Sequence, residues 1–255
     1  MTFEALDSLD GQVAVITGAM GGIGLATAER LAKQGARIMG IVRRNLEYAQ
    51  SQLDQLPNSH LKHCAILADV TDSAQMRNAV KQVMLSAGKC NILVNTAGST
   101  HRIPHHDLDQ LTDEFFDDIT KNNLRSYFTV VRAFAPLMKK SDEALIVNIG
   151  SVAGQNAGGG SNMAYCAAKA GIDSLTKNLS RALAPQIRVM GVSPGALATN
   201  FVPNTVPGYL DSIAKTTPLK RVPTVYDVAA AVEACVRLLR FTTGNVIAID
   251  GGRTI

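Results

Sequence analysis

The chain has 255 residues, of which 46% are hydrophobic, and a formal net charge of +4. This length and apolar content suit one α/β domain with a sizeable core, and no Pro- or Ser-rich linker divides the chain. Its 25 basic residues are dispersed, which gives nucleic-acid binding little support. The first residues lack the basic and apolar regions of a signal peptide, and no apolar run reaches the length of a membrane span. We therefore expect a cytoplasmic protein with no membrane partner.

Seven short apolar runs alternate along the chain with segments of helical periodicity. The runs lie at 13–16, 37–42, 64–67, 91–94, 145–149, 187–192 and 245–249. Such alternation predicts βαβ units, and continuous apolar runs are typical of strands in a parallel sheet that is covered on both faces. We predict a single doubly wound α/β domain over residues 1–255, with helices on both faces of the sheet and residues 1–10 as a short N-terminal extension.

A glycine-rich turn follows the first apolar run. It reads Thr17-Gly18-Ala19-Met20-Gly21-Gly22-Ile23-Gly24, and a segment with helical spacing of apolar residues comes next. In such a strand–turn–helix unit, glycine lets the backbone approach a pyrophosphate, and the free N–H groups at the helix start act as donors. The spacing Gly-x-x-x-Gly-x-Gly differs from the commoner Gly-x-Gly-x-x-Gly. A turn of this kind also serves as a plain helix start, so it does not settle the cofactor alone.

A tyrosine and a lysine four residues apart form a second motif. It reads Tyr165-Cys166-Ala167-Ala168-Lys169, and Ser151 precedes Tyr165 by fourteen residues. Positions i and i+4 share a helix face, so the hydroxyl and the ammonium can reach one pocket. A nearby cation favours the phenolate and lowers the pKa of a tyrosine from about 10, which would make Tyr165 usable for proton transfer. Taken alone, the pair is equally typical of a simple contact on a helix surface.

The order of these motifs resembles that of a known family. From about Leu9 to Gly252 the chain is similar to a classical short-chain dehydrogenase/reductase, a family with a Rossmann-type fold. Further matching stretches follow in order: Asp69-Val70, Asn95-Thr96-Ala97-Gly98, Asn122-Asn123-Leu124, Gly150-Ser151-Val152-Ala153-Gly154, Ser193-Pro194-Gly195 with Thr199, and Asp250-Gly251-Gly252. Two features depart from the pattern. Thr96 replaces a second Asn, and the gap between Ser151 and Tyr165 is a residue or so longer than usual, a surplus that we place in the Gly158-Gly159-Gly160 loop.

The resemblance implies a catalytic set of Asn123, Ser151, Tyr165 and Lys169. Tyr165 would be the general acid in ketone reduction and the base in the reverse reaction. Ser151 would donate a hydrogen bond to the carbonyl oxygen, where charge develops in the transition state. Lys169 would lower the pKa of Tyr165 and bind the nicotinamide ribose, and Asn123 would hold the water that relays the proton.

The resemblance also implies a nicotinamide cofactor site. We expect it to comprise Gly18, Gly22, Ile23, Gly24, Arg43, Arg44, Asp69, Val70, Asn95, Ala97, Gly98, Tyr165, Lys169, Pro194, Gly195, Leu197 and Thr199. Asp69 and Val70 would flank the adenine ring. Relatives that prefer NAD carry Asp or Glu at the end of the second strand for the ribose 2′-hydroxyl, where this chain has Val42 followed by Arg43 and Arg44.

Because a guanidinium forms charge-assisted hydrogen bonds with a phosphate, these arginines predict NADP(H) as the preferred cofactor. Arg43 would be the main contact, and NAD(H) remains possible. The alternative is that two arginines at a strand end are simply solvated.

These residues predict an oxidoreductase that interconverts a ketone and a secondary alcohol by hydride transfer. We expect a small hydrophobic substrate, alicyclic or aromatic, and a substrate lid over 196–222. The apolar residues of that lid are Phe201, Val202, Val206, Tyr209, Leu210 and Ile213.

Three alternatives stay open. Epimerases and dehydratases share the scaffold, and so do non-catalytic NADP(H)-sensing proteins, although these usually lack the tyrosine or the lysine. A third is a 3-oxoacyl-carrier-protein reductase, whose acidic partner docks on basic residues before the fifth strand and after the Tyr/Lys helix. Here those stretches are Lys139-Lys140-Ser141-Asp142-Glu143 and Ala182-Leu183-Ala184-Pro185-Gln186, which lack the expected arginines.

The remaining polar residues suggest no metal. The four cysteines, at 64, 90, 166 and 235, are scattered and are interpreted as reduced, with Cys166 as small apolar filler. His101, Arg102, His105 and His106 form a dense polar cluster, which we interpret as a solvated loop because Pro104 interrupts it. Its place beside the ligand crevice would let one of these side chains touch substrate. The family resemblance implies a homo-oligomer, a tetramer or dimer built partly from helices at 111–138 and 163–184.

Overall fold

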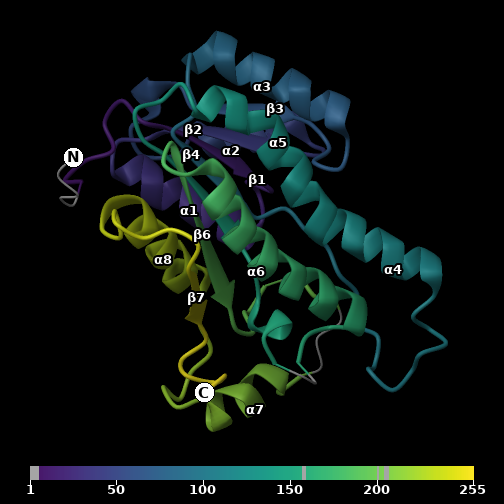
Figure 1. The fold of residues 1–255 in the computed structure, drawn as a ribbon. Coiled ribbons are helices and arrows are strands. Elements are labelled where there is room, and N and C mark those ends of the chain that lie inside the picture. The colour runs from purple at the N-terminus through teal and green to yellow at the C-terminus, as the bar shows by residue number, and fades with distance from the viewer. Residues whose placement is uncertain (1–5, 157–158, 200, 204–206) are drawn as a thin grey trace.

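A computed structural model describes residues 6–156, 159–199, 201–203 and 207–255. Residues 1–5 of the predicted extension, Gly158 of the glycine loop and Val206 of the predicted lid lie outside these ranges. All seven predicted runs form strands of one parallel sheet with the order β3-β2-β1-β4-β5-β6-β7 (Figure 1). The strands are β1 (Val13–Thr17), β2 (Arg37–Val42), β3 (Cys64–Leu67), β4 (Ile92–Asn95), β5 (Ala144–Ile149), β6 (Ile187–Pro194) and β7 (Val246–Ile249).

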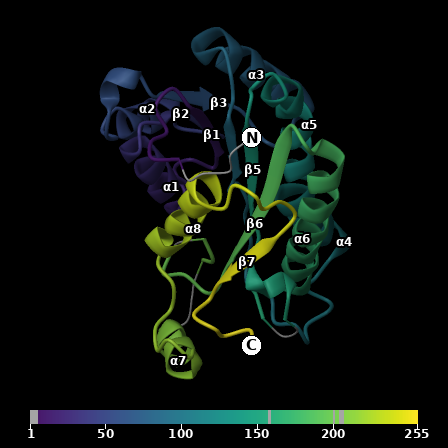
Figure 2. The same ribbon diagram turned by 60° about the vertical axis from the view of Figure 1, so that its left-hand side comes forward.

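Helices cover both faces of this sheet, as the sequence predicts. They are α1 (Gly22–Lys33), α2 (Leu46–Leu53), α3 (Ser73–Ala87), α4 (Asp113–Thr120), α5 (Ser126–Met138), α6 (Met163–Leu183), α7 (Tyr209–Thr216) and α8 (Val225–Arg237). Figure 2 shows α1, α2 and α8 on one face and α3, α5 and α6 on the other. A π-helical segment, Lys121–Arg125, joins α4 to α5, and short 3₁₀ turns lie at Ser59–Leu61 and Val152–Gly154. Among the described helices, none is both long and apolar enough to cross a membrane.

Two apolar cores lie on either side of the sheet because successive side chains of a strand point to opposite faces. On one side Ala14 and Ile16 of β1 pack with Leu31 of α1 and Val232 of α8. On the other side Val15 packs with side chains that include Phe134 of α5. All five residues of β1 and all six of β5 are buried, which explains why their sequences are continuous apolar runs rather than alternating ones.

The winding of the chain reverses at β1, which lies between β2 and β4. In open α/β sheets ligands bind at such a switch point, outside the carboxyl ends of the strands. Thr17 and Asn95 are paired at these ends, and the Thr96 hydroxyl donates to the Thr17 carbonyl oxygen at 2.6 Å. Thr96 therefore joins the two strand ends by its own hydrogen bond, although it departs from the family pattern.

Three helix starts at this edge are fixed by capping side chains. Asp72 accepts hydrogen bonds from the first turn of α3, and Asn162 accepts one from the backbone N–H of Tyr165 in α6. Thr224 and Asp227 form a capping box at the start of α8. Each cap satisfies backbone donors that a helix start otherwise leaves unpaired. The caps thus hold the first turns of these helices firmly at the edge where the predicted site residues lie.

Candidate active site

The glycine-rich turn after β1 has a shape that only glycine can adopt at two positions. Gly18 has a φ of +64°, and a Cβ on Gly24 would lie 2.3 Å from the Gly18 carbonyl oxygen. The N-cap residue of α1, Gly21, makes no side-chain cap, so the first N–H groups of the helix face the turn without a side-chain acceptor. A close backbone and unused N–H donors fit a pyrophosphate. Gly18, Gly22, Ile23 and Gly24 are thus placed where the sequence predicts the cofactor phosphates.

The end of β4 lies directly beside this turn. A Cβ on Gly18 would lie 2.9 Å from the Cα of Ala97, so the two backbones are in contact. Asn95 is buried, and its side-chain amide donates to Asn148 of β5 at 2.9 Å. Asn148 in turn donates to Thr176 of α6 at 3.0 Å. This chain of amides locks β4, β5 and α6 together below the predicted cofactor and catalytic residues.

The other predicted cofactor residues also lie at the carboxyl edge of the sheet. Asp69 and Val70 follow β3, and both are half-buried. The Asp69 carboxylate accepts hydrogen bonds from the Thr71 amide and hydroxyl, each at 2.8 Å. Arg43 and Arg44 follow β2 and are exposed, and within the described part of the chain neither forms an ion pair.

The segment after β6 completes the edge. Pro194 is the last residue of β6, and Gly195, Leu197 and Thr199 follow it. A Cβ on Gly22 would lie 3.2 Å from Thr199 Cγ2. The segment therefore contacts the glycine-rich turn across the switch point. The fold thus brings the predicted cofactor residues, which lie between positions 18 and 199 of the sequence, to one edge of the sheet. Their roles toward a cofactor stay predictions.

Asn123 lies in the π-helical segment between α4 and α5. Its side chain is fully buried, donates to the carbonyl oxygens of Ile119 and Ser99 at 2.9 and 2.8 Å, and accepts from the Ser99 amide at 3.3 Å. Gly98 fits against it, since a Cβ there would lie 2.6 Å from Asn123 Oδ1. The side chain thus anchors the loop after β4. Its predicted role in holding a water stays a prediction.

Tyr165 and Lys169 share a face of α6, as predicted, and both are buried, with 8% and 3% of their surface exposed. Ser151 lies between the end of β5 and the 3₁₀ turn Val152–Gly154, and its hydroxyl accepts a hydrogen bond from the Ala153 amide at 3.1 Å. The 3₁₀ turn that follows packs closely on α6, because a Cβ on Gly154 would lie only 2.4 Å from the Ala170 nitrogen. This contact brings Ser151 close to Tyr165, and the interaction between the two side chains lowers the pKa of Tyr165.

The ammonium of Lys169 is held by the end of β5. It donates to the Ile149 carbonyl oxygen at 2.8 Å and to the Tyr127 hydroxyl at 3.4 Å. Tyr127 donates to the same carbonyl at 2.9 Å. Lys169 Nζ lies 5.6 Å from the centroid of the Tyr165 ring. The cation is therefore fixed near the ring, while its donated hydrogen bonds go to other groups.

This arrangement corrects one expectation about Tyr165. Burial raises the pKa of Tyr165, and the interaction with Ser151 acts in the opposite direction with a smaller effect. The lowered pKa that the sequence suggests is not observed, because desolvation disfavours the phenolate and the ammonium is directed at Ile149. Burial also lowers the pKa of Lys169 to about 7. Tyr165 is consequently a phenol at neutral pH, the form that can give up a proton.

Asp173 is a polar residue near the site that the sequence reasoning missed. It follows Lys169 by four residues on α6 and counteracts the lowering of the Lys169 pKa. Its carboxylate accepts from Gln155 at 2.9 Å and from the Ser193 hydroxyl at 3.5 Å, and burial raises its own pKa. The helical spacing from Lys169 was the available signal.

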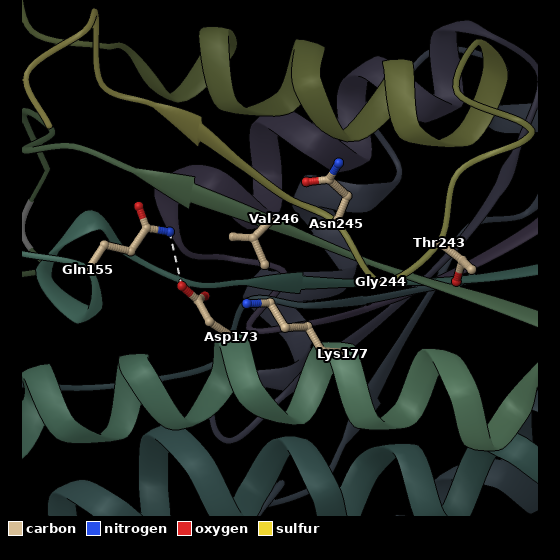
Figure 3. A pocket seen from close by; sticks show the side chains of 7 residues that line it. All are labelled: Gln155, Asp173, Lys177, Thr243, Gly244, Asn245 and Val246. Atoms are coloured by element: carbon tan, nitrogen blue, oxygen red, sulfur yellow. Dashed lines mark hydrogen bonds between the residues drawn. The ribbon is translucent and has the colours of Figure 1, made fainter. Parts of the chain in front are cut away.

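Asp173 also borders a hollow between α6 and the β7 edge (Figure 3). The hollow has a volume of about 440 Å³ and is lined by Gln155, Asp173, Lys177, Thr243, Gly244, Asn245 and Val246. It contains none of the predicted site residues. We expect the active site at Tyr165, because this predicted acid, Ser151 and the glycine-rich turn converge at the carboxyl edge of the sheet.

The predicted substrate side faces the same edge. The Phe201 ring lies 5.9 Å from the Tyr165 ring, and α7 forms the outer part of the 196–222 segment. In the cluster after β4, His101, Arg102 and His106 are exposed, as the solvated-loop interpretation requires. His105 departs from that interpretation, because it is partly buried and its Nε2 has no hydrogen-bond partner among the described residues. The described residues contain no group of three or more potential ligands that could hold a metal.

The four cysteines are free thiols, as expected. Cys90 and Cys235 are buried, whereas Cys64 and Cys166 are partly buried. Cys166 donates to the Gly159 carbonyl oxygen at 2.9 Å and packs on the small cluster around Ala153 and Tyr165. It fills space beside the predicted acid and points to a loop carbonyl, which agrees with its interpretation as filler.

Known proteins match the chain over nearly its whole length. The profile of the short chain dehydrogenase family covers residues 12–209. The 3-oxoacyl-[acyl-carrier-protein] reductase of Thermotoga maritima is 33% identical over 256 residues, which cover 97% of this chain and 99% of that protein. Gluconate 5-dehydrogenase of Gluconobacter oxydans is 32% identical over 259 residues, with 100% and 99% covered. The crystal structure of levodione reductase matches with a TM-score of 0.86 at 26% identity, over 96% of this chain and 98% of that chain.

The chain therefore belongs to the short-chain dehydrogenase/reductase family, as the sequence motifs indicate. Its relatives are NAD(P)-dependent dehydrogenases and reductases that act on CH–OH and carbonyl groups. The enzyme class follows from this membership together with the presence of Tyr165, Ser151 and Lys169 at one edge of the sheet.

The buried ammonium predicts how stability depends on pH. The pKa of Lys169 is about 7 in the folded chain and 10.5 for a lysine exposed to water, so between these values the unfolded chain binds more protons and stability rises with pH. Lys169→Met removes this dependence. We compare the free energy of unfolding of the unsubstituted protein with that of Lys169→Met. We expect the difference between them to increase, in favour of the unsubstituted protein, by on the order of 2 kcal/mol between pH 7 and 9.

Urea unfolding at several pH values measures this difference. Lys177→Met is the matched control, because Lys177 is an exposed lysine two turns further along α6. Its difference from the unsubstituted protein should stay flat over the same pH range. A flat difference for Lys169→Met as well would show that the Lys169 amine is not titrating near neutrality.

Proposed function

We propose that the protein is an NADP(H)-dependent reductase of small, largely apolar ketones, which oxidises the corresponding secondary alcohols in the reverse direction. One observation carries the proposal: the phenol of Tyr165 is buried between Ser151 and the ring of Phe201, and this burial raises its pKa and so favours the protonated form at neutral pH. An acid of this kind suits the reduction of a carbonyl, where the oxygen must gain a proton.

The chain's own residues would act on the carbonyl oxygen. Tyr165 gives its hydroxyl proton to that oxygen, and Ser151 donates a hydrogen bond to it as negative charge develops. Lys169, held at the Ile149 carbonyl, would bind the nicotinamide ribose. A bound nicotinamide supplies the hydride. In alcohol oxidation the same groups act in the reverse direction. Tyr165 is then the base, so its hydroxyl must first lose its proton.

The preference for NADP(H) rests on the end of β2. Val42 is buried there and provides no acceptor for a ribose 2′-hydroxyl, while Arg43 and Arg44 follow it with exposed guanidinium groups. An exposed guanidinium without an acidic partner is available for the charge-assisted, often bidentate hydrogen bonds that a 2′-phosphate accepts.

The preference for a compact apolar ketone rests on the 196–222 segment, which we propose to be a substrate lid. Phe201 lies against Tyr165, and Ile213 of α7 is buried. Pockets with mostly apolar walls and few polar groups favour small apolar ligands. The name of levodione reductase is consistent with ketone reduction on this scaffold.

A carrier-bound 3-oxoacyl substrate is the second candidate, favoured by the name of the Thermotoga maritima relative. Lys139 and Lys140 are exposed, as docking of an acidic carrier would require. However, they follow α5 and lead into the amino end of β5, whereas Tyr165 lies at the carboxyl edge. Arg240 pairs with Glu143, so the negative charge of this carboxylate near the two lysines is partly neutralised. The obstacle to docking is therefore the position of the lysines. Within one chain, this basic pair is therefore poorly placed to bring a carrier to Tyr165.

We also propose that the enzyme is a homo-oligomer. Several large apolar side chains are exposed on or near α4, α5 and α6: Leu108, Phe116, Phe128 and Met163. Apolar side chains gathered on neighbouring helices support burial against a second copy.

Tyr165→Phe tests the acid. Loss of the hydroxyl removes general acid catalysis, which is worth about 10²–10⁴-fold, so we expect kcat for ketone reduction to fall at least about 100-fold. The affinity for NADPH, measured by fluorescence titration, should stay nearly unchanged. A variant that retained more than about a tenth of the activity would rule out Tyr165 as the acid.

Arg43→Ala tests the cofactor preference. Loss of a charge-assisted bidentate contact should lower kcat/KM for NADPH by about tenfold or more while leaving kcat/KM for NADH within about twofold. Steady-state kinetics with both cofactors measure the ratio, and Arg37→Ala serves as a control at the other end of β2. An unchanged ratio in Arg43→Ala, or a better kcat/KM with NADH in the unsubstituted enzyme, would contradict the assignment.

A further inference from the structure

Arg102 lines a hollow at the carboxyl edge of the sheet. The hollow has a volume of about 380 Å³ and is bordered by His101, Arg102, Pro104 and Pro203. The guanidinium carbon of Arg102 lies 5.0 Å from the centroid of the Tyr209 ring at the start of α7. An arginine of the loop after β4 thus meets the 196–222 segment, more than a hundred residues further along the chain.

The backbone that carries Arg102 is fixed to the start of α6. The Ile103 amide donates to the Ser161 carbonyl oxygen at 2.9 Å, and the Asn162 side chain donates to the His101 carbonyl oxygen at 2.7 Å. The same Asn162 side chain caps α6 by accepting from the Tyr165 amide at 2.8 Å. The capping residue Asn162 therefore fixes the backbone next to Arg102 relative to the backbone of Tyr165.

The lining residue Pro203 links the hollow along the chain to a neighbour of Tyr165. Pro203 borders the hollow, and two residues before it Phe201 places its ring 5.9 Å from the Tyr165 ring. A substrate whose carbonyl reaches Tyr165 and whose body lies along Phe201 extends toward this hollow. Arg102 is then the charged group at its far end.

The guanidinium is available to an anion. Among the described residues Arg102 forms no ion pair. Of the carboxylates in the two segments, Asp107 is hydrogen-bonded to Gln110, whereas Asp109 of the loop and Asp211 of α7 are exposed. A guanidinium that stacks on a ring keeps its N–H groups free at its edge. A bidentate charge-assisted pair is stronger than an exposed stacking contact. A carboxylate that pairs with Arg102 therefore adds more interaction free energy than the stack on Tyr209 provides.

We propose that Arg102 is a specificity-determining residue that binds a carboxylate of the substrate, so that the ketone of the proposed function is an oxo acid with an apolar body. This inference rests on that function. The apolar body lies against Phe201, its carbonyl meets Tyr165 and Ser151, and its carboxylate meets the Arg102–Tyr209 pair. Tyr209 supports the guanidinium from one side and so reduces the freedom that the arginine loses on binding.

Matched ketones that differ only in charge test the proposal. The probes are 4-acetylbenzoate and 4-oxocyclohexanecarboxylate, each compared with its methyl ester, with NADPH as cofactor. We expect kcat/KM for the acids to exceed that for the esters by about tenfold or more. Arg102→Gln should remove this preference and leave the esters within about twofold. Arg102→Lys should restore part of it, because it keeps the charge but loses the planar fork.

Arg132→Gln is the matched control. Arg132 also stacks on an aromatic ring, with its guanidinium carbon 5.5 Å from the Phe128 centroid, but it lies on α5 and donates to Ser73. Its substitution should preserve the preference for acids. Equal kcat/KM for acids and esters in the unsubstituted enzyme would overturn the proposal. Equal losses for both in Arg102→Gln would also overturn it, since Arg102 would then only support α7.

Calorimetry separates this proposal from the proposed function. Binding of 4-acetylbenzoate is measured with NADP⁺ present, in the unsubstituted enzyme and in Arg102→Gln. Weaker binding by about tenfold in the variant is expected whether or not the ketone is reduced. If none of the four ketones is reduced but this difference remains, the proposed reductase function fails and the carboxylate site stands. If the ketones are reduced and binding is equal in the two proteins, the carboxylate site fails and the reductase function stands.

Discussion

The hydrogen bond from Lys169 to the Ile149 carbonyl oxygen organises this active site. It fixes α6 to the end of β5, and Tyr127 reinforces it by donating to the same carbonyl. An ammonium that is removed from water loses much of its hydration, so the surrounding groups must compensate for it. Asp173 opposes the resulting fall in the Lys169 pKa from one helical turn away. The ammonium fixed in this way lies 5.6 Å from the centroid of the Tyr165 ring, one turn before it on α6.

Other elements of the fold place the remaining site residues around Tyr165 and Lys169. The cap at Asn162 sets the start of α6 and ties it to the loop after β4, while the packing of Gly154 on α6 brings Ser151 close to Tyr165. On the other side of the switch point, the glycine-rich turn leaves room and N–H donors for a pyrophosphate. Tyr165 and the glycine-rich turn thus reach the same edge because both follow the carboxyl ends of parallel strands.

Local sequence was sufficient for the strands and for the shared face of Tyr165 and Lys169, because side-chain periodicity and helical spacing depend on near neighbours. It was insufficient where distant segments meet. The raised pKa of Tyr165 comes from burial by surrounding elements, which outweighs the cation that spacing alone suggested. The stacking of Arg102 on Tyr209 joins two loops far apart in the sequence, and no local pattern marks it.

The central claim is that burial, and not the nearby ammonium, determines the protonation of Tyr165. Titration of tyrosinate absorbance from pH 6 to pH 12, compared between the unsubstituted protein and Tyr165→Phe without cofactor, measures this protonation directly. The account predicts that the difference between the two proteins shows no ionisation of Tyr165 below about pH 10, the value for an unperturbed tyrosine. A tyrosinate signal that appears between pH 6 and pH 8 and is absent in Tyr165→Phe would contradict it.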